Sequence, residues 1–277
     1  MLETIQNQIS TLSSELVYRL KLWQHQYNLP ALDAGDRLIV NTLKTEGVYI
    51  TNLEELGLTS TTELLTSAHS QLAQTSTVSN QNTSRRLPQI YTVTDLAAFS
   101  NWGQETRLLQ IIENYLGLPV AFQGVHLRKD FPNQHQFGTL LWHKDSEDRK
   151  MVKIIIYLND VDEKHGAFEY VPVHLTSFPH RNAYRINHKL KQSGYLGLTD
   201  EQLEAIISKS AWKSCPGAAG TVIITDPRTA IHHGTIRTQE RPALFFVYTA
   251  NPPKRPELCT QYWDQTYARP EINQVPV

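Results

Sequence analysis

A series of short β-branched and aromatic segments fills the second half of the chain and constrains its fold more than any other feature. From about residue 119 onward these segments read VAFQGVHLR, TLLWHKD, MVKIIIYLNDV, AFEYVPV, GTVIITD and ALFFVYTAN. Turn-forming residues separate them, including Asn133, Gly166, Gly217 and Gly220. Short strands spaced in this way are typical of a β-sandwich or a jelly roll. We therefore expect a mainly β protein whose core lies in its second half.

The first 118 residues carry helical patterns instead. Residues 3–24 place Ile5, Ile9, Leu12, Leu16 and Leu20 at the spacing of an amphipathic helix. Further elements are expected as helices over 36–46, 61–73 and 104–116, a short strand over 48–50, and an exposed polar loop over 74–86. The chain is thus expected to form one structural domain, in which a mainly helical portion, residues 1–118, packs on a β core, residues 119–277.

Charge and composition argue against several classes of function. The formal net charge is -1, so the global charge indicates neither a nucleic-acid partner nor an anionic membrane. No apolar run approaches the ~20 residues of a transmembrane helix. The N-terminal MLETIQNQIS does not resemble a secretory signal. Cys215 and Cys259 form neither a disulfide framework nor a paired motif. A cytoplasmic protein that acts on a small molecule is the simplest expectation.

The strongest chemical signal is Trp142-His143-Lys144-Asp145, with His232 far downstream. In an extended strand the side chains at i and i+2 point to the same side, so His143 and Asp145 would converge. Two histidines and one carboxylate leave three positions open on iron(II), which suits a chelating 2-oxo acid and dioxygen. An HxD pair taken alone is more often a surface turn with two polar residues.

Arg241 lies nine residues after His232 and opens the segment ALFFVY. A guanidinium at this position can make a two-pronged contact with the distal carboxylate of 2-oxoglutarate. Taken alone, such an arginine is more often part of a salt bridge at the rim. Because the chain also contains the HxD pair and the step His232-His233-Gly234, we favour a role of Arg241 in binding the co-substrate.

Four motifs in this order resemble a known family. WHKD, KIIIYLNDVDEKHGAFEYVP, GTVIITDPRTAIHHG and the trailing Arg241 are similar to the phytanoyl-CoA dioxygenase-like branch of the 2-oxoglutarate- and iron(II)-dependent oxygenases, over residues ~119–250. The resemblance implies a double-stranded β-helix, the jelly-roll core of cupin-like proteins, with flanking helices. It also implies iron at His143, Asp145 and His232, and 2-oxoglutarate at Arg241. Val173-His174-Leu175 replaces the family's Gly-Ser-His, so the family's named substrate is not carried over.

Other residues are secondary candidates for the site. His233 competes with His232 for the metal, but the family's HxG step favours His232. Possible contacts with 2-oxoglutarate are assigned to Thr235, His126 and Lys153. Each of these also has an ordinary structural interpretation, such as a half-buried strand histidine or a surface lysine.

An insertion at about 174–215 interrupts the strand pattern and concentrates positive charge. It holds His174, His180, Arg181, Arg185, His188, Lys189 and Lys191. One interpretation is a solvated loop. The other is a lid over the iron site that recognises an anionic substrate, with Arg181, Arg185 and Trp142 as candidate substrate contacts.

Three functional hypotheses follow. The first is an oxygenase that uses iron(II), 2-oxoglutarate and dioxygen to hydroxylate an aliphatic carbon of a small molecule. Acyl-CoA thioesters, amino acids and specialised metabolites are compatible substrates, and desaturation or ring closure are compatible outcomes. The second is a halogenase, disfavoured because Asp145 occupies the position on iron that a halide needs. The third is a cupin-like binding protein, which has no need of Arg241.

Overall fold

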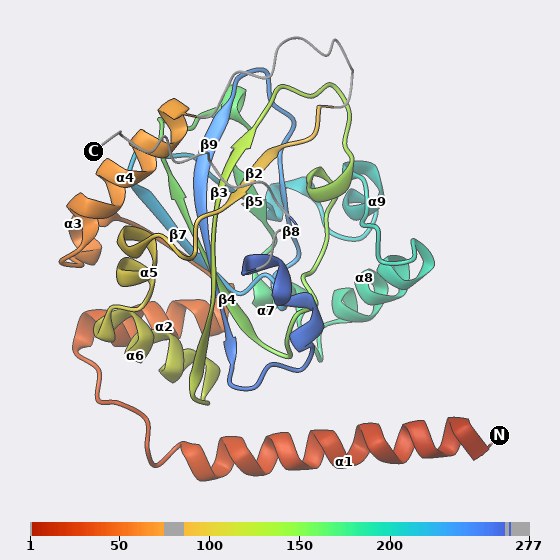
Figure 1. Ribbon diagram of the computed structural model, residues 1–277. Helices are drawn as coiled ribbons and strands as arrows, with labels where there is room; N and C mark the ends of the chain where they lie inside the picture. The colour runs from red at the N-terminus through yellow and green to blue at the C-terminus, as the bar shows by residue number, and fades with distance from the viewer. Residues whose placement is uncertain (1, 75–85, 264–265, 267–277) are drawn as a thin grey trace.

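The structure is a computed structural model that describes residues 2–74, 86–263 and 266, with side chains from residue 13 onward. It consists of two β-sheets and the helices that surround them (Figure 1). Most of the polar loop expected over 74–86 lies outside the described residues. Among the described residues, no helix combines the length and the apolar character needed to cross a membrane.

The helices expected from the N-terminal patterns are present, with small shifts at their ends. The α-helices are α1 (Leu2–His25), α2 (Ala34–Glu46), α3 (Leu53–Leu56), α4 (Thr61–Gln74), α5 (Ala97–Gly103), α6 (Thr106–Leu116), α7 (Val173–Thr176), α8 (Arg181–Gln192) and α9 (Asp200–Glu204). Gly47 and Gly117 end α2 and α6 with φ values of 83° and 73°, a conformation that costs glycine little.

The strands form two antiparallel sheets. They are β1 (Val48–Asn52), β2 (Gln89–Thr92), β3 (Val120–Asp130), β4 (Met151–Tyr157), β5 (Phe168–Tyr170), β6 (Lys213–Cys215), β7 (Thr221–Thr225), β8 (His232–Gly234) and β9 (Arg241–Ala250). The larger sheet has the order β1-β7-β4-β9-β3-β2, and the smaller has the order β6-β5-β8. The expected two-layered β core is therefore present.

The larger sheet is buried on both faces. Successive strand residues point to opposite sides, so Ile154 and Ile156 of β4 pack against the helical layer. Ile155 and Tyr157 of the same strand pack toward the smaller sheet, beside Phe168. Figure 1 shows α2 to α6 on one side of the larger sheet and the smaller sheet on the other. This double burial explains the apolar run in MVKIIIY, which Lys153 interrupts.

The N-terminal portion is not only helical. The short strand expected over 48–50 is present as β1, which pairs with β7, and β2 pairs with β3. The segment before residue 118 thus supplies both edge strands of the larger sheet. The β2 strand was not expected, because its four residues are too few to show an alternating pattern.

The insertion forms a compact helical layer around its own small core. α8 buries Ala183, Ile186 and Leu190 and leaves its charged side chains at the surface. Ile186 and Leu190 belong to a buried cluster that also contains Trp142, Val171, Leu198, Leu203, Ile207, Trp212 and Ile231. α8 therefore packs on the segment that carries His143 and on the approach to β8.

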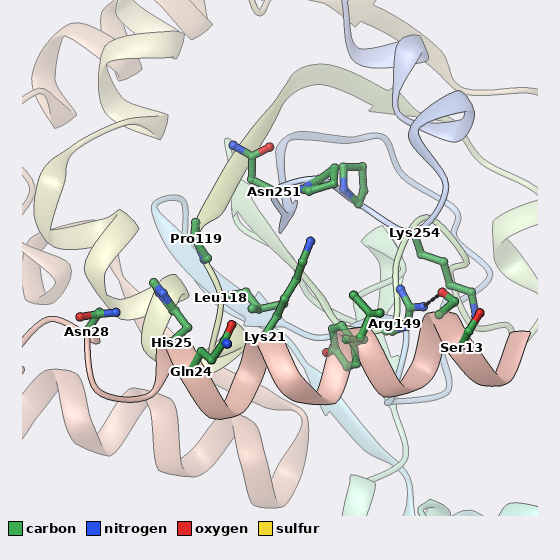
Figure 2. A pocket seen from close by; sticks show the side chains of 15 residues that line it. Ser13, Lys21, Gln24, His25, Asn28, Leu118, Pro119, Arg149, Asn251 and Lys254 are labelled. Atoms are coloured by element: carbon green, nitrogen blue, oxygen red, sulfur yellow. Dashed lines mark hydrogen bonds between the residues drawn. The ribbon is translucent and has the colours of Figure 1, made fainter. Parts of the chain in front are cut away.

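α1 lies along one end of the molecule and is held by polar contacts. Glu15 pairs with Arg149 at 2.9 Å, and His25 pairs with Glu113 at 2.7 Å. A polar groove of about 700 Å³ lies between α1 and the ends of β3 and β9, and Lys21 points into it (Figure 2). The apolar positions Leu16 and Leu20, expected on the buried face, are instead 68% and 52% exposed.

One buried hydrogen bond ties the helical layer to the turn after β7. The hydroxyl of Tyr115 in α6 donates to the fully buried carboxylate of Asp226 at 2.7 Å. We expect Tyr115→Phe to lower the free energy of unfolding by about 1–3 kcal/mol, because a buried acceptor loses its partner. Urea unfolding measures this, with Tyr91→Phe, a half-buried tyrosine of β2, as the matched control. Equal effects of the two substitutions would contradict the assignment.

Candidate metal centre

A backbone bridge holds two histidines next to each other. The N–H of His143 donates to the carbonyl of His232 at 2.9 Å, and the N–H of His232 donates to the carbonyl of His143 at 3.1 Å. This reciprocal pairing places the two residues opposite each other, as in an antiparallel ladder. Their ring centroids are 4.4 Å apart.

Asp145 follows on the same side of the chain. A regular strand was expected at residues 142–145. The structure instead has an extended loop there, held by isolated backbone hydrogen bonds. Trp142 pairs with Leu198, and the N–H of Asp145 donates to the carbonyl of Pro227 at 2.9 Å. The segment is extended enough for the i, i+2 rule to hold, so His143 and Asp145 face the same cavity.

The three side chains present their ligand atoms to one point. Nε2 of His143 and Nε2 of His232 lie 3.6 Å and 4.0 Å from Oδ1 of Asp145. All three ligand atoms lie within 4.8 Å of one another. Nδ1 of His143 is bonded to the carbonyl of Leu141, and Nδ1 of His232 to that of Ala230. These bonds fix the ring orientations and leave Nε2 free, so the set can hold a metal ion.

Burial keeps both imidazoles in the form that binds metals. Burial lowers the pKa of His143, and burial together with His143 lowers the pKa of His232 to about 3. Burial alone would raise the pKa of Asp145, but Lys153 and the two histidines hold it well below its usual range. Neutral imidazoles and an ionised carboxylate are the protonation states that a metal ion requires.

Lys153 fixes the other oxygen of that carboxylate. Its Nζ lies 2.6 Å from Oδ2 of Asp145 and 3.2 Å from Oε1 of Glu147. Burial would lower the pKa of Lys153, but these carboxylates raise it well above its usual value. The ammonium group therefore leaves Oδ1 of Asp145 as the oxygen directed toward the histidines.

The side chain of His233 is directed away from the place where the ligand atoms of His143, Asp145 and His232 converge. Its Nδ1 is bonded to the carbonyl of Leu140 at 3.0 Å, and its Nε2 to Oε2 of Glu169 at 2.9 Å. Its ring stacks on Trp142 with centroids 3.8 Å apart. Both ring nitrogens are thus engaged elsewhere, and the geometry favours His232, as the HxG step predicted.

A cluster of three arginines around one buried carboxylate forms the other end of the site. Arg128, Arg237 and Arg241 approach Asp130 at 2.8, 2.8 and 2.9 Å. Burial would raise the pKa of Asp130, but the three guanidinium groups keep it well below its usual range. Three cations share one anion, so this end carries a surplus of positive charge that an anionic ligand can neutralise.

Arg241 is held in place from two sides. Its Nη2 donates to Asp130, and its Nη1 donates to the carbonyl of Gly166. A β-carbon at Gly234 would lie 2.9 Å from Nη2 of Arg237 and 3.4 Å from Nη2 of Arg241. The glycine of the HHG step therefore leaves room for the guanidinium groups.

A cavity of about 110 Å³ between the two sheets joins the two ends. It is lined by Arg128, Thr139, His143, Asp145, Lys153, Ile155, Phe168, Thr225, Pro227, His232, His233, Gly234, Arg241 and Phe245. The expected residues His143, Asp145, His232, Arg241 and Lys153 are thus brought together in one cavity.

Of the secondary candidates, Lys153 lines this cavity, but His126, Thr235 and Trp142 do not. His126 turns toward the C-terminal segment, where its Nε2 bonds to the carbonyl of Gln261 and its ring packs on Tyr262. Thr235 donates its hydroxyl to the carbonyl of Ala167. Trp142 is fully buried between His233 and Trp212 and donates to Asp200, so it supports the site from behind.

The insertion does not line the cavity either. Arg181 lies exposed at the start of α8, and Arg185 donates to the carbonyl of Ala205 at 2.8 Å. The buried face of α8 fits against the cluster around Trp142, which directs its basic side chains outward. It stays a prediction that this segment acts as a lid. It also stays a prediction that these two arginines bind the substrate.

The sequence reasoning missed Arg128, Asp130 and Arg237. Arg128 and Asp130 show the same i, i+2 spacing as His143 and Asp145, and β3 places both on the inner face of the larger sheet. That spacing could have indicated from the sequence that Arg128 and Asp130 share one face of a strand. Arg237 lies in a loop, and no pattern in the sequence indicates that it reaches Asp130.

Comparison with known families decides the class of protein. The phytanoyl-CoA dioxygenase family matches residues 60–243, which is more than half of the chain. The chain belongs to this family. Its members are iron(II)- and 2-oxoglutarate-dependent dioxygenases, so the enzyme class and the cofactors expected from the sequence are confirmed. The match also begins well before residue 119, so family character extends into the helical portion. A comparison with curated proteins found no match.

Solved structures share the fold at low sequence identity. EctD from S. alaskensis, solved with 2-oxoglutarate and 5-hydroxyectoine, has a TM-score of 0.53 and 15% identity, over 80% of this chain and 77% of that chain. AviO1 from Streptomyces viridochromogenes Tue57 has a TM-score of 0.52 and 16% identity, over 81% and 98% of the two chains. The epimerase SnoN from nogalamycin biosynthesis has a TM-score of 0.52 and 14% identity, over 78% and 83%. These likenesses confirm the jelly-roll fold.

The buried neutral histidines predict a stability that depends on pH in the iron-free protein. The folded chain holds His232 with a pKa of about 3, whereas an unfolded histidine titrates near ~6.5. Between these values the unfolded chain binds the extra proton. Stability is therefore present above pH ~6.5 and falls as the pH drops, by up to about 1.4 kcal/mol per pH unit for each such histidine.

Urea unfolding of the iron-free protein at several pH values between 7 and about 4.5 measures this slope. We expect His232→Asn, which has no titrating ring, to show a shallower slope than the parent protein. An identical slope in the two proteins would show that His232 is not its source.

Proposed function

We propose that this dioxygenase hydroxylates an aliphatic carbon of a small molecule, with iron held by His143, Asp145 and His232 and 2-oxoglutarate held by Arg241. One observation carries the proposal. A cavity has three convergent metal-ligand atoms at one end and a surplus of guanidinium charge, at Arg241, at the other. A metal-chelating dianion such as 2-oxoglutarate matches both ends at once.

The donor set fits iron(II). Two neutral imidazoles and one carboxylate form a facial set that leaves positions open for co-substrate and dioxygen. Iron(II) bound there supplies the activation of dioxygen, and the overall reaction converts substrate, 2-oxoglutarate and O₂ into hydroxylated substrate, succinate and CO₂. Asp145 occupies the carboxylate position, which argues against a halogenase. Desaturation, ring closure or epimerisation remain alternative outcomes, since a shared fold does not determine the reaction.

The other residues of the cavity orient and shield the reactants. Lys153 holds Oδ2 of Asp145, which presents the carboxylate through Oδ1. Asp130 holds Nε and Nη2 of Arg241, and this arginine lines the cavity. Phe168, whose ring centroid lies 5.3 Å from that of His232, and Phe245 provide apolar walls that limit the access of water.

The proposed ligand set predicts which substitutions remove iron. His143→Ala, Asp145→Ala and His232→Ala should each abolish iron binding and the release of succinate from 2-oxoglutarate. His233→Gln, which changes the histidine with both nitrogens engaged elsewhere, should keep about one iron per chain. Metal analysis of the purified variants measures this, with near-equal unfolding midpoints as the control for folding. A fully iron-loaded His232→Ala variant would exclude His232 from the ligand set.

The proposed role of Arg241 predicts weaker binding of the co-substrate. Arg241→Ala should raise the Kd for 2-oxoglutarate by about 100-fold or more, because the distal carboxylate would lose its charged partner. Arg241→Lys should restore only part of the affinity, since an ammonium group cannot make the two-pronged contact. Anaerobic titration of 2-oxoglutarate into the iron-loaded variants measures this. Unchanged affinity in Arg241→Ala, with iron retained, would place the co-substrate elsewhere.

A further inference from the structure

A second, strongly basic cleft lies behind the segment that carries His143 and Asp145. Two adjoining hollows of about 510 and 670 Å³ share Lys144, Asn187, Tyr195 and Arg228 in their walls. We call this combined space the basic cleft. It lies between residues 144–149, the turn after β7, residue 255 and α8.

Every fully charged side chain in the wall of the basic cleft is positive. These are Lys144, Arg149, Lys191, Arg228 and Arg255, and His188 lies beside them. The whole chain has 26 basic and 27 acidic residues, so an all-basic wall is not what its composition predicts. The balance of charge over the whole molecule therefore conceals a local concentration of positive charge.

Four of these cations lack an acidic partner in the part of the chain that the structure describes. Arg149 pairs with Glu15, but Lys144, Lys191, Arg228 and Arg255 have no carboxylate oxygen of a described side chain within 4.0 Å. The buried carboxylate of Asp226 already accepts hydrogen bonds from Tyr115 and from the backbone N–H groups of Arg228 and Thr229. An anion from solution can thus enter without displacing an internal ion pair.

The basic cleft and the metal cavity are separate. Lys144 sits between two residues that face the cavity, and alternation along the extended segment directs it to the opposite side. Pro227 lines the cavity while the next residue, Arg228, lines the basic cleft and donates its Nη1 to the carbonyl of Asp145 at 3.3 Å. A single layer of backbone therefore divides the two spaces.

Aromatic side chains form the rim of the basic cleft. Phe178, Tyr184 and Tyr195 are 90%, 76% and 71% exposed. Ser146, Ser177 and Asn187 add hydroxyl and amide groups to the wall of the basic cleft. Cations, neutral hydrogen-bond donors and exposed rings together suit a ligand with an oxyanion at one end and a planar apolar body at the other.

We propose that the basic cleft binds an organic phosphate, with the phosphate group on Arg228 and Arg255 and an aromatic body against Tyr195. This binding site is distinct from the proposed 2-oxoglutarate site, and its ligand does not depend on the reaction proposed above. The anion contacts Arg228 and Arg255 and not Arg181 and Arg185, which the sequence had suggested.

Calorimetric titration of the iron-free 277-residue chain tests the proposal in a phosphate-free buffer of low ionic strength. Phenyl phosphate should bind saturably at one site per chain, and inorganic phosphate more weakly, because it lacks the ring. The double variant Arg228→Gln/Arg255→Gln should bind phenyl phosphate at least about tenfold more weakly, as expected for two lost charge-assisted contacts. Tyr195→Gly should weaken the binding of phenyl phosphate and leave that of inorganic phosphate unchanged.

Two control variants separate this site from other positive groups. Arg181→Gln/Lys189→Gln removes the same charge from the part of α8 outside the basic cleft and should leave the affinity unchanged. Arg241→Ala removes the anion-binding group of the metal cavity and should also leave it unchanged. The proposal is overturned if neither phosphate binds saturably, if both double variants weaken binding equally, or if only Arg241→Ala abolishes it. Urea midpoints show whether each variant is folded.

Discussion

The reciprocal backbone bond between His143 and His232 is the interaction on which the site depends. It joins an irregular loop to a three-residue strand of the smaller sheet, and it fixes two rings that are 89 positions apart in the sequence. Backbone bonds set the separation of the two residues more firmly than contacts between flexible side chains would. The packing of Trp142 against the insertion then supports the bridge from behind. The helices of the insertion thereby contribute to the metal centre without touching it.

The opposite end of the cavity relies on charge. Asp130 is a shared counterion for three guanidinium groups, none of which has a full negative charge to itself. Such a cluster is costly to bury and gains stability when an anion enters. The rigid antiparallel register of β3 and β9, which sets Asp130 opposite Arg241, keeps this arrangement ready before any ligand arrives.

The sequence predicted the parts of the site that follow local rules. The spacing of His143 and Asp145, the HHG step and Arg241 are all short-range patterns, and the alternation of β-branched runs indicated the two-layered core. What it did not predict depends on contacts between distant segments. The position of His126 depends on a turn near residue 261, and the outward direction of Arg181 and Arg185 depends on which face of α8 meets Trp142. The basic cleft likewise unites residues 144, 191, 228 and 255, which no local window contains.

The ion pair between Lys153 and Asp145 has a consequence for the order in which the site is filled. Asp145, Glu147 and Lys153 together carry a formal charge of -1 beside two neutral imidazoles. A dianion approaching this end meets repulsion until a divalent cation has reversed the sign. Metal and co-substrate therefore strengthen each other's binding by the same factor, as thermodynamic reciprocity requires. In an iron-free chain the attraction for a dianion therefore comes from the arginine cluster at the other end of the cavity.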